Sequence, residues 1–155
     1  MDVRRFMDSD EIALLPVFLS SVRNIASRDY TPEQIEAWAP TNIDQKKWFS
    51  HIKELRPFVV TVGEEIVGYA DVQSNGYIDN FFVSGTWSKQ GVGTLLMNRI
   101  HEEARMLGIV ELSSDVSVTA ESFFLHHGFH VVERRFPVRY GVILQNALMQ
   151  KDLQK

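Results

Sequence analysis

A glycine-rich turn is the part of the chain best suited to binding a ligand. It follows the apolar run 81–83 and leads through Gly91 and Gly93 into a long amphipathic segment. Where a strand turns into a helix, unpaired backbone N–H groups and the positive end of the helix dipole point at one spot. Glycine has no Cβ, so a pyrophosphate can approach the backbone closely. The turn therefore predicts a phosphate site, to which Lys89 and Gln90 add side-chain donors.

Two common phosphate-binding motifs do not fit this turn. A Walker loop needs a glycine, four further residues and then Gly-Lys-Ser/Thr, but no lysine follows Gly91 or Gly93. The dinucleotide fingerprint needs a third glycine where this chain has Leu96, and it belongs to a parallel βαβ unit. The alternative to a phosphate site is structural: Gly91 and Gly93 would only permit a tight turn between strand and helix.

Carboxylates on the neighbouring strands are candidates for a catalytic base. Asp79 interrupts the apolar run before the turn, and its alternative role is an outward-facing strand carboxylate. Asp115 near the end of a later strand is the second candidate, with helix capping as its alternative.

The chain has no cysteine, which excludes a thiol nucleophile and a thiolate metal site. We expect no metal, because the side chains of His126, His127 and His130 are placed to diverge.

Periodicity in the first third of the chain predicts the helices that would flank such a site. Apolar residues recur at helical spacing, and prolines end the second and third stretches. Thr31 is a suitable N-cap, followed by proline and by Gln34 at the position that closes a capping box. The expected helices are residues 8–26, 31–38 and 44–55.

The remainder of the chain mixes strands with two further helices. Apolar residues there follow each other directly or at every second position, which is typical of strands. The expected strands are 58–62, 66–72, 77–83, 109–116, 129–136 and 142–149, the first three as a meander, and the expected helices are 91–107 and 119–127. This order predicts an α+β fold with a mixed sheet.

Composition narrows the classes of function. A length of 155 residues, with 45% hydrophobic residues and no linker-like segment, predicts one domain over residues 1–155. The net charge of −4 provides no field that would attract nucleic acid. The charged start does not resemble a signal peptide, and the apolar run 12–18 is too short to span a bilayer. We expect a soluble, cytoplasmic protein that binds neither nucleic acid nor membrane.

Two motifs resemble those of the GNAT superfamily of acyl-CoA-dependent N-acetyltransferases. The pyrophosphate loop of that family, Gln/Arg-x-x-Gly-x-Gly/Ala, corresponds to residues 88–93. Its second signature, Ala-x-x-Phe/Leu-Tyr-x-x-x-Gly-Phe, corresponds to residues 120–129. Both occur in the family's order, and the order of elements is similar over nearly the whole chain. The resemblance implies a mixed, mostly antiparallel central sheet with a splayed strand pair, flanked by helices.

The resemblance also implies a cofactor site for acetyl-CoA, the acyl donor. It would lie in a cleft between the strand ending at Val83 and the strand ending near Val116. Pantetheine would pair with the backbone of Phe81, Phe82 and Val83, as an added strand does. Ser117 occupies a position that often contacts the cofactor in the family. The residues expected around the pyrophosphate are Ser88, Lys89, Gln90, Gly91, Val92, Gly93 and Thr94.

Two of the residues expected at the cofactor depart from the family pattern. Ser88 replaces the usual glutamine or arginine, which removes a long donor to the phosphates. Phe124 stands where the family often has the tyrosine that protonates the departing CoA thiolate, and a phenyl ring has no proton to give. Either another group or water would serve as the acid, or the thiolate would leave unassisted. Because a thiol with a pKa of about 8.5 is a tolerable leaving group as its anion, we expect transfer to be slower and not abolished.

The activity implied by the resemblance is direct transfer of an acetyl group from acetyl-CoA to a primary amine. An alkylamine is mostly protonated at neutral pH, so Asp79 or Asp115 would help as a base. The backbone amide near Phe82 or Val83 would polarise the thioester carbonyl. Since the chain has no cysteine, we expect no covalent enzyme intermediate.

The acceptor is expected to be a small-molecule or peptide amine. Tyr30 and Trp38 fall in the segment that walls the acceptor pocket in the family, although a tryptophan on a short helix also fits a core position. Ser88 and Phe124 leave a CoA-binding sensor or interaction module without turnover as the alternative function. A nucleotide-binding domain is a third hypothesis. For the quaternary structure we expect a monomer or a homodimer.

Overall fold

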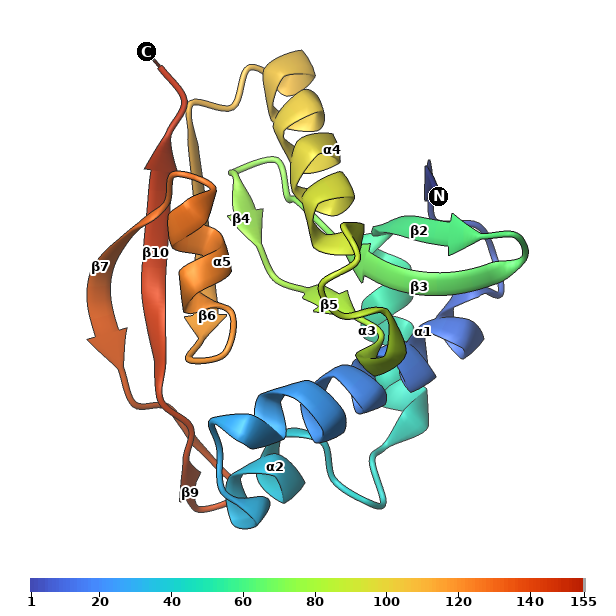
Figure 1. Cartoon of the computed structure of the whole chain (residues 1–155), viewed down its shortest axis with the longest axis vertical. Helices are drawn as coiled ribbons and strands as arrows, with labels where there is room; N and C mark the ends of the chain where they lie inside the picture. The colour runs from blue at the N-terminus through green and yellow to red at the C-terminus, as the bar shows by residue number, and fades with distance from the viewer. Residues whose placement is uncertain (155) are drawn as a thin grey trace.

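Two four-stranded sheets form the framework, and one of the points at which the chain crosses between them lies between residues 78 and 81 (Figure 1). The structure is a computed structural model and describes residues 1–154. The first sheet is antiparallel, with the order β1 (Asp2–Arg5), β2 (Phe58–Val62), β3 (Glu65–Ala70) and β5 (Phe81–Val83). The second has the order β4 (Tyr77–Ile78), β6 (Glu111–Ser117), β10 (Asn146–Asp152) and β7 (His130–Arg135). In this second sheet β4 and β6 run parallel, and the other neighbours run antiparallel.

Helices cover these sheets. The α-helices are α1 (Asp10–Ser20), α2 (Pro32–Trp38), α3 (Gln45–Leu55), α4 (Val92–Leu107) and α5 (Glu121–His126). After α1 the chain continues through a π-helical turn, η1 (Ser21–Ile25), and a 3-10 turn, η2 (Ala26–Arg28), and the 3-10 turn η3 (Gly85–Trp87) precedes α4. A small hairpin pairs β8 (Val138–Arg139) with β9 (Val142–Ile143). Within residues 1–154, no helix is long and apolar enough to cross a membrane.

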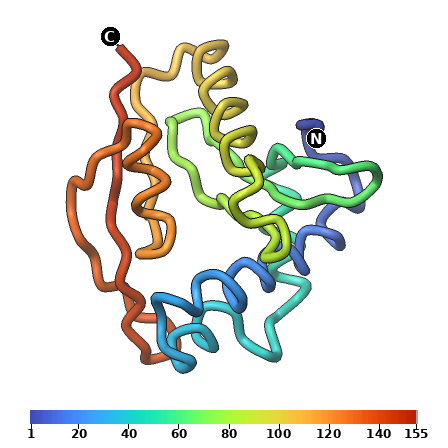
Figure 2. The backbone as a smooth tube through the Cα atoms, in the orientation of Figure 1, coloured from blue at the N-terminus to red at the C-terminus, as the bar shows by residue number. Residues whose placement is uncertain are grey.

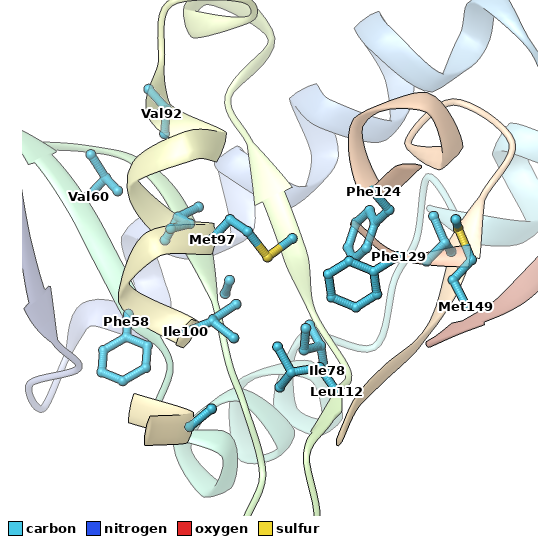
Figure 3. Packing of buried hydrophobic residues seen from close by; sticks show 14 of the residues in the cluster. Phe58, Val60, Ile78, Val92, Met97, Ile100, Leu112, Phe124, Phe129 and Met149 are labelled. Carbon is cyan, nitrogen blue, oxygen red and sulfur yellow. The ribbon is translucent and has the colours of Figure 1, made fainter. Parts of the chain in front are cut away.

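The first sheet is buried on both faces. Phe58 and Val60 of β2 belong to an apolar cluster that includes α4 and the second sheet. Val59 belongs to a different cluster, built with residues of α1 and α3 on the opposite face. Figure 3 shows the first cluster, in which Met97 and Ile100 of α4 lie between side chains of the two sheets. Burial on both faces explains why the run 58–62 is mostly apolar and not alternating.

The predicted fold class is confirmed. The fold is α+β, its strands are mostly antiparallel, and helices flank the sheets. The splayed strand pair is also present, because β4 pairs with β6 whereas β5 has left β6 to pair with β3. The predicted capping box is formed, since the Thr31 hydroxyl accepts from the Gln34 amide and the Gln34 side chain accepts from the Thr31 amide.

Some predicted elements are wrong in their extent. The strand expected over 77–83 is two strands in two sheets, because the backbone N–H groups of Asp79 and Asn80 bind the Asp71 carboxylate. The helix expected over 8–26 ends at Ser20 and continues as η1 and η2, and the strand expected over 142–149 is divided into β9 and β10. The pattern does not predict β1 at all. Its sequence, Asp-Val-Arg-Arg, is charged in the way that suits an edge strand.

Residues 20–30, which we call the crossing segment, run between the two sheets at the open end of the splay (Figure 2). At one end the Ser20 hydroxyl accepts a hydrogen bond of 2.9 Å from the Gly85 amide. At the other end the Tyr30 hydroxyl accepts one of 2.9 Å from the Val118 amide and donates to the Gln145 carbonyl. These contacts attach the crossing segment to both sheets, so it closes one side of the space between β5 and β6.

The Tyr30 hydroxyl is therefore expected to stabilise the fold. Tyr30→Phe removes both of its hydrogen bonds and leaves the Val118 N–H and the Gln145 carbonyl without that partner. We expect the free energy of unfolding to fall by about 2 kcal/mol, measured by urea denaturation. Tyr140→Phe is the matched control, since the Tyr140 side chain is exposed. Equal stabilities for the two variants would contradict this role.

Candidate active site

A cavity of about 580 Å³ occupies the splay between β5 and β6. A volume of this size is usual for a small-molecule site. Its walls come from β5, the start of α4, the end of β6, α5 and the crossing segment. The predicted site residues that line it are Trp38, Phe81, Phe82, Val83, Ser88, Lys89, Gly91, Gly93, Thr94 and Ser117. The structure thus brings together residues that are up to 79 positions apart in the sequence.

The start of α4 forms one end of this cavity. Gly91 has φ +90, a left-handed conformation that favours glycine, and a Cβ built there meets no protein atom within 4 Å. The Leu95 amide makes the first helical bond, to the Gly91 carbonyl, so the preceding N–H groups of the first turn have no helical acceptor. Lys89 and Arg28 add positive charge to the lining. This end of the cavity has the chemistry of a phosphate site.

The free edge of β5 forms a second wall. In the described chain β5 is the last strand of its sheet, and β3 covers its other edge. Asp71 pairs with Asn80 through an N–H to carbonyl bond, and the Ser84 amide bonds to the Val67 carbonyl. Because an antiparallel ladder alternates, the backbone groups of Phe82 face β3, and those of Phe81 and Val83 face the cavity. The Phe82 N–H therefore points away from the cavity. Of the two amides predicted to polarise the thioester carbonyl, only that of Val83 faces the cavity, and the Phe81 N–H faces it as well.

A buried carboxylate lies at the apex of the splay. Asp71 follows β3 and is only 2% exposed. Its Oδ1 accepts hydrogen bonds of 3.1 Å from the Asp79 amide and 2.6 Å from the Asn80 amide. Burial, reinforced by the nearby Asp79 charge, raises the pKa of Asp71 to about 6, although the two amides act in the opposite direction. The carboxylate is therefore held at a site that penalises its charge.

The raised pKa of Asp71 predicts how stability depends on pH. In the unfolded chain this pKa is about 3.9, so between pH 4 and 6 the folded protein keeps a proton that the unfolded chain has released. Relative to Asp71→Asn, the wild type is expected to lose about 2 kcal/mol of unfolding free energy as the pH rises from 4 to 7. Urea denaturation of both proteins across this range measures the difference. A difference that is constant with pH would contradict the assignment.

Asp79, the first candidate base, is paired with a histidine. Its Oδ2 lies 2.7 Å from Nε2 of His51 on α3 and also accepts from the Asn80 side-chain amide at 2.9 Å. An ionised carboxylate only accepts, so Nε2–H of His51 donates and Nδ1 of a neutral ring is left as a proton acceptor. Neither Asp79 nor His51 lines the cavity, and Asp79 lies two residues before Phe81, which does. No sequence motif points to His51, because the pair joins residues 28 positions apart.

Asp115, the second candidate, is held by other side chains. The Tyr77 hydroxyl donates to its Oδ2 at 2.8 Å, and Arg135 forms an ion pair with its Oδ1 at 3.0 Å. Burial and the Asp115 carboxylate raise the pKa of the Tyr77 hydroxyl, so Tyr77 remains a donor to Asp115. Asp115 does not line the cavity. With both oxygens engaged, Asp115 is the less suitable base of the two.

The two predicted acceptor residues occupy different environments. Trp38 lines the cavity, with its ring 6.3 Å from that of Phe82 and 5.5 Å from that of Tyr30. Tyr30 is 8% exposed and lies outside the lining, with its hydroxyl bonded to the backbone. Burial raises the pKa of that hydroxyl, which keeps it protonated. Tyr30 therefore supports Trp38 and the crossing segment, and it does not face the cavity.

Three predicted cofactor residues also lie outside the lining. Phe124 and Val92 are buried in the core, and Figure 3 shows the Phe124 ring beside Phe129. The Gln90 side chain bonds back to the Thr86 carbonyl. Phe123, one position before Phe124, lines the cavity instead. The motif places this helix correctly but does not predict which phenylalanine faces the cavity. Phe81 of β5 contacts both rings, and Phe124 also packs on Phe129 in the core.

Sequence reasoning missed most of the crossing segment's contribution. The crossing segment contributes six residues to the cavity lining: Ser21, Val22, Ile25, Ala26, Arg28 and Asp29. The helical stripe of this region identifies which residues are apolar, but it carries no signal that the segment spans the opening between two sheets. The backbone bonds of Tyr30 create that position, and they depend on residues more than 80 positions away.

Comparison with known proteins agrees with this geometry. A family model described as an acetyltransferase (GNAT) domain matches residues 26–151. The chain belongs to the GNAT family of acetyltransferases. The acetyltransferase is 29% identical over 150 residues to the uncharacterized N-acetyltransferase YafP of Escherichia coli strain K12, a match that covers 97% of this chain and 95% of YafP.

Solved structures share the fold of the acetyltransferase. The GCN5-related N-acetyltransferase "Aminotransferase, Class-II" from Rhodopseudomonas palustris has a TM-score of 0.92 and 27% identity, covering 98% of this chain and 95% of that one. PaiA N-acetyltransferase from Thermoplasma acidophilum, solved in complex with coenzyme A, has a TM-score of 0.77 and 16% identity, covering 97% and 98%. Family and fold together identify the chain as an N-acetyltransferase.

Proposed function

We propose that residues 1–155 act as one acetyltransferase domain that moves an acetyl group from acetyl-CoA directly to a primary amine. The observation that carries the proposal is one cavity lined by both the free edge of β5 and the start of α4. The first is suited to an extended amide-containing chain, and the second to a phosphate. Acetyl-CoA has both groups. A cytoplasmic location and a monomeric or homodimeric state stay predictions.

The donor would lie along β5 with its phosphates at α4. The N–H groups near Gly91 and Gly93 would bind the pyrophosphate, and Lys89 with Arg28 would supply the cationic donors that Ser88 does not. From there the pantetheine would run along Val83 toward the apex. The Phe81 N–H faces the cavity nearest to the apex, so we assign it to the thioester oxygen, where negative charge develops.

The acceptor amine would approach from the side of Trp38 and Phe82. It must lose a proton to attack, and Asp79 with His51 would take this proton, directly or through one water. Attack forms the C–N bond, the C–S bond then breaks, and the CoA thiolate leaves. Phe124 is buried and has no proton to give, so water would protonate the thiolate. The acceptor is a small-molecule or peptide amine in this proposal.

Thermal melting tests the donor assignment. The protein is melted alone and with acetyl-CoA, CoA, ATP or NAD, each at the same high concentration. A ligand at about 100 times its Kd adds about 2.7 kcal/mol, or roughly 5–10 °C for a chain of this length. We expect this shift with acetyl-CoA and with CoA. A shift with ATP or NAD and none with either CoA form would overturn the proposal.

A further inference from the structure

One buried carboxylate lies where the chain returns from the second sheet to the first, between β4 and β5. Ile78 is paired with β6 of the second sheet, and Phe81 is paired with β3 of the first. Between them, the amides of Asp79 and Asn80 bind neither sheet and share Oδ1 of Asp71. The Asp71 amide in turn donates to the Asn80 carbonyl at 3.1 Å. Asp71 thus binds the two residues at the apex of the splay through three hydrogen bonds.

These bonds determine where two groups of the proposed reaction lie. The Asn80 carbonyl and the Phe81 N–H belong to the same peptide plane, so the bond to that carbonyl orients that amide. The hydrogen bond to the Asp79 amide holds the backbone of Asp79, whose side chain is the candidate base. Asp79 also binds His51, and Asn80 accepts from the Tyr69 hydroxyl at 3.3 Å. No other carboxylate of the described chain accepts from the backbone of both residues.

We propose that Asp71 is a positioning residue that sets both the Phe81 amide and the Asp79 carboxylate for acetyl transfer. The inference rests on the proposed function, and it adds a residue that touches neither donor nor acceptor. Its role is to accept hydrogen bonds, since Oδ1 receives both backbone amides. An asparagine oxygen can accept the same two bonds without the charge.

The test compares Asp71→Ala, Asp71→Asn and the matched control Ser114→Ala. Ser114 is also buried next to this crossing, where its hydroxyl donates to the Ile78 carbonyl at 2.7 Å, but it binds neither Asp79 nor Asn80. Each variant is assayed for kcat and for the KM of acetyl-CoA by thiol release. We expect Asp71→Ala to lower kcat about 30-fold with KM for acetyl-CoA changed less than about 3-fold. Asp71→Asn and Ser114→Ala should keep kcat within about 3-fold of the wild type.

Amide NMR provides a readout that needs neither activity nor the alanine variant. The Asn80 amide proton should resonate unusually far downfield in the wild type, because it makes a short bond to a carboxylate. In Asp71→Asn this shift should shrink while the Phe81 resonance stays in place. Failure of the proposed function would appear as no thiol release by the wild type, with the NMR result unchanged.

Three results would overturn the role of Asp71. The first is an alanine variant that is folded and has the kcat of the wild type. The second is an asparagine variant as slow as the alanine variant, which would mean that charge and not hydrogen bonding is required. The third is an ordinary Asn80 amide shift in the wild type.

Discussion

Replacing Gly91 by valine is expected to weaken acetyl-CoA binding about 100-fold. Gly91 lines the cavity at the start of α4 with φ +90, where a β-branched residue is strained. A Cβ built there meets no protein atom within 4 Å, and because Gly91 lines the cavity we expect the valine side chain to compete with the pyrophosphate proposed to bind there. Loss of one or two charge-assisted hydrogen bonds, at about 1.5–3 kcal/mol each, accounts for a 100-fold effect. Isothermal titration calorimetry with acetyl-CoA measures the change.

Gly108→Val is the matched control for this experiment. Gly108 ends the same helix with φ +69, and a Cβ built there also meets no protein atom within 4 Å. It does not line the cavity. Both variants should lose stability to backbone strain, about 1–2 kcal/mol. If Gly108→Val weakened acetyl-CoA binding as much as Gly91→Val, helix strain and not the phosphate site would explain the loss.

Replacing Asp79 by asparagine is expected to lower kcat about 100-fold and to leave acetyl-CoA affinity unchanged. General-base catalysis contributes roughly 10²–10⁴-fold, and asparagine cannot take up the proton. Its side-chain oxygen can still accept from His51, so the local geometry should survive. The measurement is the rate of thiol release at saturating acetyl-CoA, with an amine that the wild type acetylates.

Asp115→Asn separates the two candidate bases. Asp115 is bound by Tyr77 and Arg135 on the other sheet, so its substitution should change kcat less than about 5-fold. A 100-fold loss in Asp115→Asn together with a nearly active Asp79→Asn would assign the base to β6. Full activity in both variants would mean that neither carboxylate takes the proton.

The parts of the fold and site that follow from sequence are those coded locally. The glycines of the turn, the capping box at Thr31 and the helix that carries Phe123 each depend on residues within one or two helical turns. The apolar run before the turn predicts a strand there, although not its division after Ile78. These signals are sufficient for the fold class and for the glycine turn that forms one end of the cavity.

The parts that sequence did not supply depend on distant contacts. The run 77–83 reads as one strand, but it is divided between two sheets where the Asp71 carboxylate, eight positions before Asp79, binds the backbone. His51 meets Asp79 across 28 positions, and Tyr30 reaches Gln145 across 115. The sequence also does not indicate which side chain lines the cavity, since Phe123 and Phe124 are adjacent and of the same type. Phe81 contacts both rings, and the two differ in that Phe124 packs on Phe129 in the core whereas Phe123 lines the cavity.

The most direct test of the proposed function is the appearance of free CoA thiol when the protein is mixed with acetyl-CoA and a panel of primary amines. The panel should include polyamines, amino acids and peptide amino termini, with mass spectrometry to detect the acetylated product. We expect at least one amine to give thiol and acetyl-amine in equal amounts, and this production to fall in Asp79→Asn. Binding of acetyl-CoA without thiol release by any amine would contradict the account and would favour a CoA-binding sensor.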